Sequence, residues 1–194
     1  MPVVALQRHH TRRIKETAVM LVEAFRAHYP KAWPTVDSAI LEVQESFNDN
    51  RISRAAVDDR GHVLGWIGAI RVYDGHVWEL HPLVVRPDMQ RKGIGRALVL
   101  DLEQEVRQRG GITLLVGTDD EDDQTSLAGV DLYPDPLCAL SDIRNVNRHP
   151  YEFYLKLGFA IVGVVPDANG LGKPDILMAK RIRPLEEEHP IGQQ

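Results

Sequence analysis

Two glycines two residues apart, Gly93 and Gly95, stand among basic side chains in the segment QRKGIGR, residues 90–96. The segment lies between a predicted strand and a predicted helix, so the first N–H groups of that helix have no partner within it and carry partial positive charge. Glycine lets an anion approach the backbone, and Arg91, Lys92 and Arg96 add cationic donors. The pattern therefore predicts a phosphate-binding loop, although glycines at a helix start also occur without any ligand.

The spacing excludes two familiar nucleotide-binding loops. The pattern GxxxxGK[ST] is absent from the chain. In the pattern GxGxxG, a third glycine would have to stand where Leu98 stands. If this loop binds an anion, it does so as neither of these two nucleotide-binding loops.

A second candidate site lies on the strand just before this loop, WELHPLVV, residues 78–85. Strand side chains alternate between the two faces of a sheet, which predicts that Glu79, His81 and Leu83 share one face. A carboxylate at Glu79 can hold an ammonium group or accept its proton through a water, and His81 can help to order the site. The alternative is a structural Glu–His pair. Pro82 cannot donate to the sheet and is expected to weaken the pairing there.

Five acidic residues follow the next predicted strand directly: Asp119, Asp120, Glu121, Asp122 and Asp123. Charge runs of this kind are usually solvated loops. Beside a ligand cleft, however, they would also attract a polycation. The spacing of a calcium-binding loop, D-x-[DN]-x-[DN]-G, is missing.

Aromatic residues and the single cysteine complete the set of candidates. Trp33 is predicted either to form a wall for a ring-shaped ligand or to anchor a loop on the core. Tyr154 comes three residues after Tyr151 and shares its helix face, where a phenol can donate a proton or simply satisfy a backbone partner. Cys138 is interpreted as structural, and no group of residues has the spacing of a metal site.

The elements that must position these residues alternate between strands and helices. A helix is expected to begin at a Thr11 cap and to bury residues up to Tyr29, and a second to begin near Asp37 and Ser38 with Leu41 on its apolar face. Hairpin-type turns separate three strands, and a long helix runs from the glycine loop to residues 110–111. The strands are predicted at residues 3–6, 52–57, 63–72, 77–85, 112–117, 160–165 and 176–182. The prediction is one α/β domain, residues 1–183, with a polar tail from residue 184 to 194.

Composition limits the functional classes. Net charge is −5 with no basic tail, which argues against nucleic-acid binding. No stretch approaches the roughly 18 apolar residues of a membrane span. A single cysteine excludes an internal disulfide and suits a reducing compartment, so the cytoplasm is expected.

Several segments together resemble one family of enzymes. QRKGIG after PLVVRPDM is similar to the pyrophosphate loop of the GNAT family of acetyl-CoA-dependent N-acetyltransferases, and YEFYLKLGF to a later helix of that family. WELHPLVV, GGITLLVGTDDE, TSLAGVDLY, HPYEFY and VGVVPDANGLGKPDILMAK resemble the aminoglycoside 6′-N-acetyltransferases within it. The resemblance is strong from about residue 66 to residue 180 and weaker before that. It implies a GNAT fold: a mixed, mostly antiparallel sheet with splayed central strands and helices on both faces.

The resemblance also implies roles for individual residues. Glu79, His81 and Tyr154 would be catalytic, with Tyr154 protonating the coenzyme A thiolate and the Leu83 N–H polarising the thioester carbonyl. Trp33, Glu79, Asp119 and Asp122 would contact the aminoglycoside. Acetyl-CoA would be held by Leu83, Val84, Val85, Gln90, Arg91, Lys92, Gly93, Ile94, Gly95, Arg96, Tyr151 and Lys156.

Acceptors other than aminoglycosides fit the same residues. The expected reaction is direct acetyl transfer to the 6′-amine of an aminoglycoside, an antibiotic-resistance activity, in an enzyme that is a homodimer by resemblance. An enzyme that acetylates a polyamine or a protein amine would carry the same acidic loop. A non-catalytic sensor that binds acyl-CoA is a third alternative, against which Glu79 and Tyr154 argue.

Overall fold

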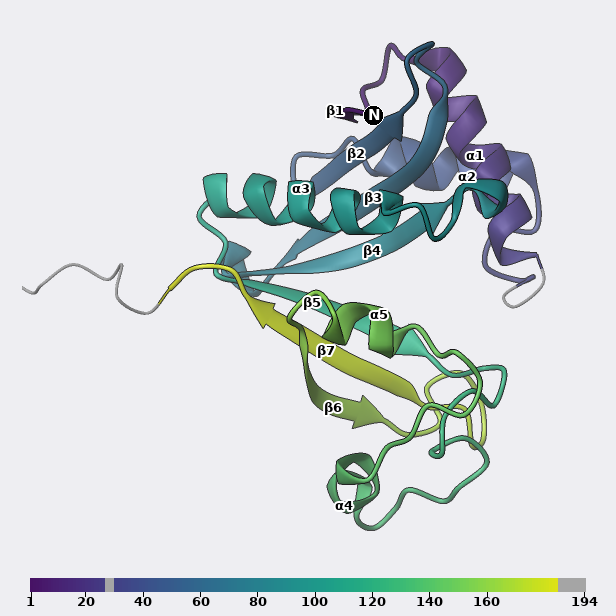
Figure 1. Cartoon of the computed structure of the whole chain (residues 1–194), viewed down its shortest axis with the longest axis vertical. Coiled ribbons are helices and arrows are strands. Elements are labelled where there is room, and N and C mark those ends of the chain that lie inside the picture. The colour runs from purple at the N-terminus through teal and green to yellow at the C-terminus, as the bar shows by residue number, and fades with distance from the viewer. Residues whose placement is uncertain (27–29, 185–194) are drawn as a thin grey trace, which may run out of the picture.

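The computed structural model describes residues 1–26 and 30–184, which form one seven-stranded sheet with helices on both of its faces (Figure 1). The strand order is β1-β2-β3-β4-β5-β7-β6, in which β4 and β5 are parallel and every other pair is antiparallel. The predicted mixed, mostly antiparallel sheet is confirmed. The elements are β1 (Val3–Ala5), α1 (Thr11–Phe25), α2 (Val36–Glu45), β2 (Arg51–Val57), β3 (Val63–Val72), η1 (Tyr73–Gly75), β4 (Val77–Val85), η2 (Pro87–Met89), α3 (Ile94–Gln108), β5 (Thr113–Asp119), α4 (Pro136–Ser141), α5 (Tyr151–Leu155), β6 (Ala160–Val165) and β7 (Asp175–Arg181).

Two hydrophobic cores lie on opposite faces of the sheet. The larger core contains Leu98 and Leu102 of α3, Tyr154 of α5 and Met178 of β7. The smaller one joins α1 and α2 to the first half of the sheet and includes Trp66 of β3. The face of the sheet that carries α1 and α2 is therefore distinct from the face that carries α3 on β3 and β4 and α5 on β6 and β7.

The first and second halves of the sheet are fastened to each other at one end. Lys180 of β7 donates to the buried carboxylate of Glu103 in α3 at 2.6 Å, and Arg107 donates to the Ile182 carbonyl at 2.9 Å. Figure 1 shows the central strands together at this end and apart at the other. Helix α3 thus holds the closed end of a wedge-shaped sheet.

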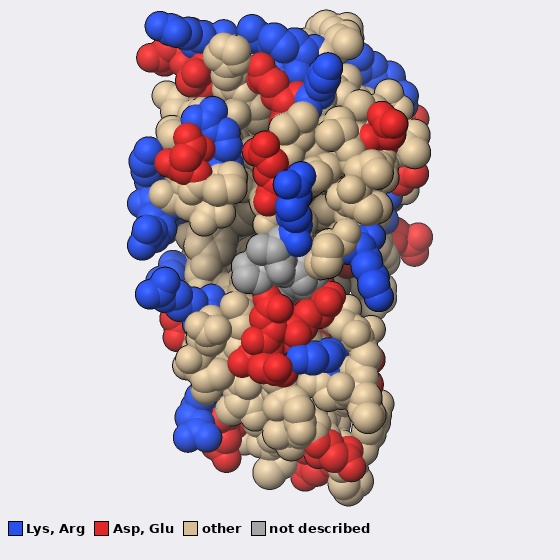
Figure 2. All heavy atoms as spheres, turned by 90° about the vertical axis from the view of Figure 1, so that its right-hand side faces the viewer, with Lys and Arg blue, Asp and Glu red and all other residues tan. Residues whose placement is uncertain are grey.

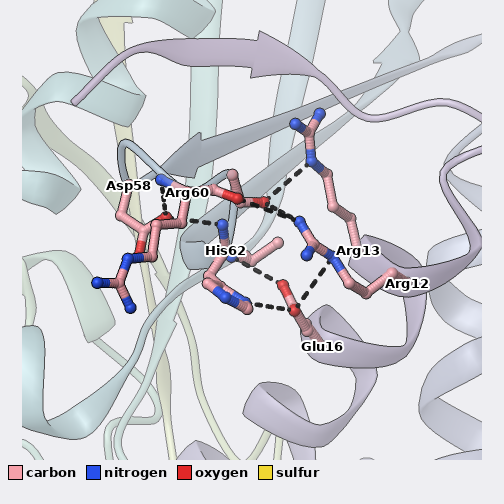
Figure 3. Close-up of polar contacts among 8 residues, drawn as sticks. Arg12, Arg13, Glu16, Asp58, Arg60 and His62 are labelled. Atoms are coloured by element: carbon pink, nitrogen blue, oxygen red, sulfur yellow. Dashed lines mark hydrogen bonds and ion pairs between the residues drawn. The ribbon is translucent and has the colours of Figure 1, made fainter.

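Helix α1 is fixed to the turn between β2 and β3 by a cluster of polar contacts (Figure 3). The Glu16 carboxylate accepts a hydrogen bond from the Val63 N–H at 2.9 Å. Arg12 and Arg13 both donate to the Gly61 carbonyl, at 3.1 and 3.2 Å. These contacts hold α1 on the sheet. Trp33 lies in the connection that follows this helix and leads to α2.

Two local predictions are corrected, and the predicted start of α2 near Asp37 and Ser38 is confirmed. Helix α1 begins at Thr11 rather than being capped by it, and the preceding His10 makes no side-chain cap bond. Helix α2 begins at Val36 after the cap Thr35, whose side chain accepts from the Ser38 N–H at 3.1 Å in a capping box. Leu41 of that helix is 61% exposed and does not lie on its apolar face.

Some features fall outside these predictions. Helix α4 was not expected; Pro136 begins it, and the Asp135 side chain caps it by accepting from the Cys138 N–H at 3.1 Å. Tyr29 and residues 185–194 of the predicted tail lie outside the described residues. Within the described ranges, every helix is too short or too polar to traverse a bilayer.

Candidate active site

The central strands separate after a short paired segment. Strands β4 and β5 pair at only three positions, ending with Glu79 opposite Leu115, although β4 continues to Val85 and β5 to Asp119. The splay expected for the central strands is thereby confirmed. A cavity of about 680 Å³ lies between the diverging strands. Its lining includes Trp33, His81, Gly117, Asp119, Leu83, Thr118 and Tyr154.

A β-bulge in β4 lies beside this cavity. Ile67 of β3 is opposite Leu83, and Ala69 is opposite Leu80, so one residue of β3 faces two residues of β4 between them. That residue is Gly68, where a Cβ atom would lie 2.5 Å from the His81 carbonyl oxygen. Glycine is therefore required for the close approach of the bulged backbone.

The bulge corrects the predicted grouping of Glu79, His81 and Leu83 on one face. Residues opposite each other in a sheet share a face, and Ile67 and Ala69 are two apart on β3. Leu83 consequently lies on the same face as Leu80 and packs against the larger core. Glu79 lies on the opposite face, toward α1 and α2. A single strand thus presents polar side chains to one side and Leu83 to the other.

His81 and Trp33 meet on the α1–α2 face of the sheet. His81 is exposed, and its ring centre lies 6.2 Å from that of Trp33. Trp33 also packs edge-to-face on Phe25 at 4.8 Å and against the smaller core. Both predicted roles of Trp33 are therefore compatible, because the residue is anchored on the core and lines the cavity.

Acidic residues from two distant parts of the chain meet at the far side of the cavity. Asp119, the last residue of β5, is directly opposite Asp175, the first residue of β7. The Asn169 side chain donates to the Asp119 carboxylate at 2.6 Å. Figure 2, which looks at the open end of the splayed strands, shows acidic side chains gathered there and basic ones along the top. A cationic ligand would be attracted to this side of the cavity.

Asp175 was not among the predicted site residues. Its carboxylate lies over Gly117, where a Cβ atom would be 2.6 Å from Oδ2, and its buried Oδ1 has no hydrogen bond to any described residue. Burial, helped by the charges of Asp119 and Glu79, raises the pKa of Asp175 to about 6. Burial and the charge of Asp119 also raise the pKa of Glu121. These carboxylates repel each other, so a bound cation would relieve the repulsion.

The acidic run divides into residues with different environments. Asp120 is fully buried and accepts from the N–H groups of Gln124 and Thr125 at 2.6 and 2.8 Å, so it shapes the loop. Asp123 forms an ion pair with Lys173 at 2.5 Å. Asp122 is exposed, and its contact with a ligand stays a prediction. The run is therefore not a uniformly solvated loop.

The two tyrosines of α5 are both buried in the larger core. Tyr154 lines the cavity, and burial keeps its pKa above the ordinary value, so the phenol is protonated at neutral pH. Its ring packs edge-to-face on Phe153 and Phe159, at 5.0 and 5.3 Å. Lys156, just after the helix, is exposed.

The glycine loop has the geometry of an anion site. Gly93, the residue before α3, adopts a left-handed conformation with φ of 83°, and a Cβ atom there would meet nothing within 4 Å. The helix has no side-chain cap, which leaves its first N–H groups available. Arg91 and Arg96 are exposed beside it, and Ile94 is buried in the core. The Gln90 side chain donates to the Val85 carbonyl at 3.4 Å and links the loop to the end of β4.

Val84 and Val85 lie on opposite faces at the end of β4. Val84 belongs to the smaller core, whereas Val85 packs against the larger core near Gly95. Gly95 also adjoins Phe153, since a Cβ atom there would lie 3.3 Å from the ring. The glycine loop and the helix carrying Tyr154 are therefore neighbours on one face of the sheet.

Comparisons with known proteins point to one family. The model of the acetyltransferase (GNAT) family matches residues 18–128. A crystal structure of an aminoglycoside 6′-N-acetyltransferase complexed with coenzyme A is 44% identical, with a TM-score of 0.86 over 95% of this chain and 98% of that one. The aminoglycoside 6′-N-acetyltransferase from Enterococcus faecium is also 44% identical, with a TM-score of 0.84 over the same shares. An aminoglycoside 6′-acetyltransferase type Ii is 38% identical, with a TM-score of 0.72 over 95% and 99%. No curated protein matches the chain.

Proposed function

Because the chain belongs to the acetyltransferase (GNAT) family, we propose that it transfers the acetyl group of acetyl-CoA to the 6′-amine of aminoglycoside antibiotics. The observation that carries this proposal is the cavity between β4 and β5, which is lined by Asp119 and Glu121 on the β5 side. On the other side, β4 leads to the basic glycine loop, which packs on α5 next to the cavity-lining Tyr154. Such a cavity suits a polycationic acceptor and a polyanionic donor. The near full-length likeness to three aminoglycoside acetyltransferases supports the choice of acceptor.

The donor side is built mainly from backbone groups. The free N–H groups at the start of α3 would bind the pyrophosphate of coenzyme A, with Arg91, Lys92 and Arg96 adding charge around it. The open space at Gly93 fits this role, because no Cβ atom obstructs the approach of the phosphates. Beyond Glu79, the edge of β4 that faces β5 pairs with no strand among the described residues, so backbone groups near Leu83 can bind the pantetheine arm.

The acceptor side is built from side chains. Asp119 and Asp122 would bind the ammonium groups of the aminoglycoside, and Trp33 would pack against one of its rings. We add Asp175 to this set, because its carboxylate faces Asp119 and lacks a partner for Oδ1 among the described residues. A cationic substrate would satisfy that oxygen.

The chemistry requires an amine without its proton. Glu79 accepts this proton through a water, and His81, next to Trp33, orders the water and the amine. The neutral amine then attacks the thioester carbon directly, while the Leu83 N–H donates to the carbonyl oxygen as negative charge develops there. Tyr154, kept protonated by burial, gives its proton to the departing thiolate, and the second proton, which the attacking nitrogen loses as the intermediate collapses, restores the phenol. No covalent acetyl-enzyme is needed.

Mass spectrometry of kanamycin after incubation with the protein and acetyl-CoA tests the proposal. One added acetyl group on the 6′-amine is expected. A matched pair of aminoglycosides that differ only in a 6′-amine or a 6′-hydroxyl gives the control, and only the amine should react. Acetylation of spermidine or of a peptide, with none on kanamycin, would replace the proposal by the polyamine or protein-amine alternative. Binding of acetyl-CoA without turnover of any amine would favour a sensor.

The proposal extends to a cytoplasmic homodimer, as the resemblance to the aminoglycoside acetyltransferases implies. Light scattering should give twice the chain mass of 21.8 kDa. A particle of single chain mass that is fully active would remove the dimer from the proposal without affecting the reaction.

A further inference from the structure

A buried histidine connects the two sides of the candidate site. His149, just before α5, is 2% exposed, although no part of the proposed chemistry uses it. Its Nδ1 accepts a hydrogen bond from the Tyr151 N–H at 3.2 Å, so Nδ1 carries no proton. Its Nε2 lies 3.1 Å from the Asp119 carbonyl oxygen, which can only accept, so Nε2 carries the proton and donates it. The two contacts together require the neutral Nε2–H form.

The backbone of His149 is held as closely as its ring. The Asn145 side chain accepts from the His149 N–H at 2.8 Å and donates to the His149 carbonyl at 2.9 Å. Asn145 is also bridged to Thr125, whose N–H is bound by the buried Asp120 carboxylate. The histidine therefore belongs to a set of contacts that includes both the acidic loop and the start of α5.

The position of the two contacts gives His149 a specific role. One nitrogen contacts the residue that ends β5 and bears an acceptor carboxylate, Asp119. The other contacts the first turn of the helix that carries Tyr154. We propose that His149 is a positioning residue that fixes the acceptor acids relative to the proton donor Tyr154. This proposal rests on the proposed acetyl transfer, because that reaction gives the two residues their roles.

The surroundings of the ring support this role. Burial lowers the pKa of His149, and the nearby carboxylates of Asp119 and Asp120 oppose that effect without reversing it. The ring of Tyr151 packs beside the imidazole at 5.5 Å. At neutral pH the ring is therefore in the form that both hydrogen bonds need.

Two substitutions separate the two hydrogen bonds. In His149→Asn the amide oxygen replaces Nδ1 and keeps the bond to Tyr151, but nothing reaches the Asp119 carbonyl. In His149→Gln the amide nitrogen replaces Nε2 and keeps the bond to Asp119, while the Tyr151 N–H loses its partner. We expect His149→Asn to raise the KM for kanamycin about tenfold, and His149→Gln to lower kcat about tenfold, as for the loss of one well-placed hydrogen bond.

Steady-state kinetics, thermal melting and coenzyme A binding are measured for the wild-type protein and both variants. The expected result is the split between KM and kcat, with unchanged affinity for coenzyme A. A purely structural histidine would give two variants with the same kinetic change, in proportion to their loss of Tm, and that result would overturn the proposal. So would two variants whose constants stay within twofold of the wild type.

Nitrogen NMR of the wild-type ring gives a readout that needs no turnover. A neutral Nε2–H form at pH 7 is expected, and an Nδ1–H form or an imidazolium would overturn the proposal. If the wild-type protein acetylates no aminoglycoside, the proposed function fails, whatever the ring shows.

Discussion

The proposed donor side and the proposed acceptor side of this site are constructed in different ways. The proposed donor side consists of backbone N–H groups at the start of α3, a helix whose apolar face is buried in the larger core. The proposed acceptor side consists of carboxylates from β5, its following loop and β7, which are held by hydrogen bonds between loops. Backbone groups survive most substitutions, whereas a carboxylate is lost with a single one. The two sides should therefore respond differently to mutation, and four experiments test that difference.

The largest effect is expected at Tyr154, the proposed proton donor. Tyr154→Phe should lower kcat about a hundredfold, as for the loss of a general acid, with the affinity for acetyl-CoA nearly unchanged. Steady-state kinetics and calorimetric titration with coenzyme A measure the two quantities. Phe153→Leu in the same helix is the control, since it removes a ring but no proton donor. A comparable loss of kcat in the control would remove the special role of the phenol.

A tenfold effect is expected for one carboxylate of the acceptor side. Asp119→Asn keeps the shape of the side chain and an oxygen for the Asn169 amide, but loses the charge. The KM for kanamycin should rise about tenfold, the typical loss for one charged hydrogen bond, while the KM for acetyl-CoA stays the same. Asp131→Asn, an exposed acid away from the cavity lining, is the matched control. Equal shifts in both KM values would show that the two sides are not separate.

A smaller effect is expected on the donor side. Gly93→Ala places a side chain at a φ of 83°, a strain of about 1 kcal/mol, so the KM for acetyl-CoA should rise about fivefold. The same change at Gly110, with φ of 81° and similarly open surroundings at the other end of α3, controls for loss of stability. An increase in the KM for kanamycin alone would contradict the assignment of this loop.

The smallest effect is a gain of stability at Asp175. Its folded-state pKa of about 6 lies above the ordinary value of 3.8, so the folded state binds more protons between these two pH values. The contribution of this group to the free energy of unfolding therefore falls as pH rises from about 4 to about 6. Above pH 6 the ionised, buried carboxylate continues to destabilise the folded state. Asp175→Asn should raise Tm slightly at pH 8 and not at pH 3.5, while weakening kanamycin binding. Thermal melts at the two pH values measure the change in Tm, with Asp123→Asn as the control. A lower Tm of Asp175→Asn at pH 8 would contradict the raised pKa assigned to Asp175.

The features that the sequence predicts well are those that depend on near neighbours in the chain. The glycine loop, the helix after it and the alternation of strands are encoded by adjacent residues, and all are present in the structure. Asp175 was missed because its position opposite Asp119 depends on the register of two strands far apart in the chain. Its place beside Pro174, in a segment that already resembled the family, was the available signal.

The bulge in β4 shows why the grouping of Glu79 with Leu83 was wrong. Strict alternation along WELHPLVV is a good local rule, but the strand has two residues opposite Gly68. A proline inside the strand and a glycine inside its neighbour were both visible, and together they indicate such an irregularity. His149 had no comparable signal, because its role depends on two contacts that only the folded chain brings together.

The bulge and the splay together have a consequence for inhibitors. Glu79 lies on one face of the sheet and Leu83 on the other, with the cavity passing between β4 and β5. A compound that covalently joins an aminoglycoside to coenzyme A would therefore have to thread through the sheet rather than lie across its surface. Its linker would lie between β4 and β5 and connect the two halves of the sheet. The linker length that gives the tightest binding would therefore measure how far these strands separate in solution.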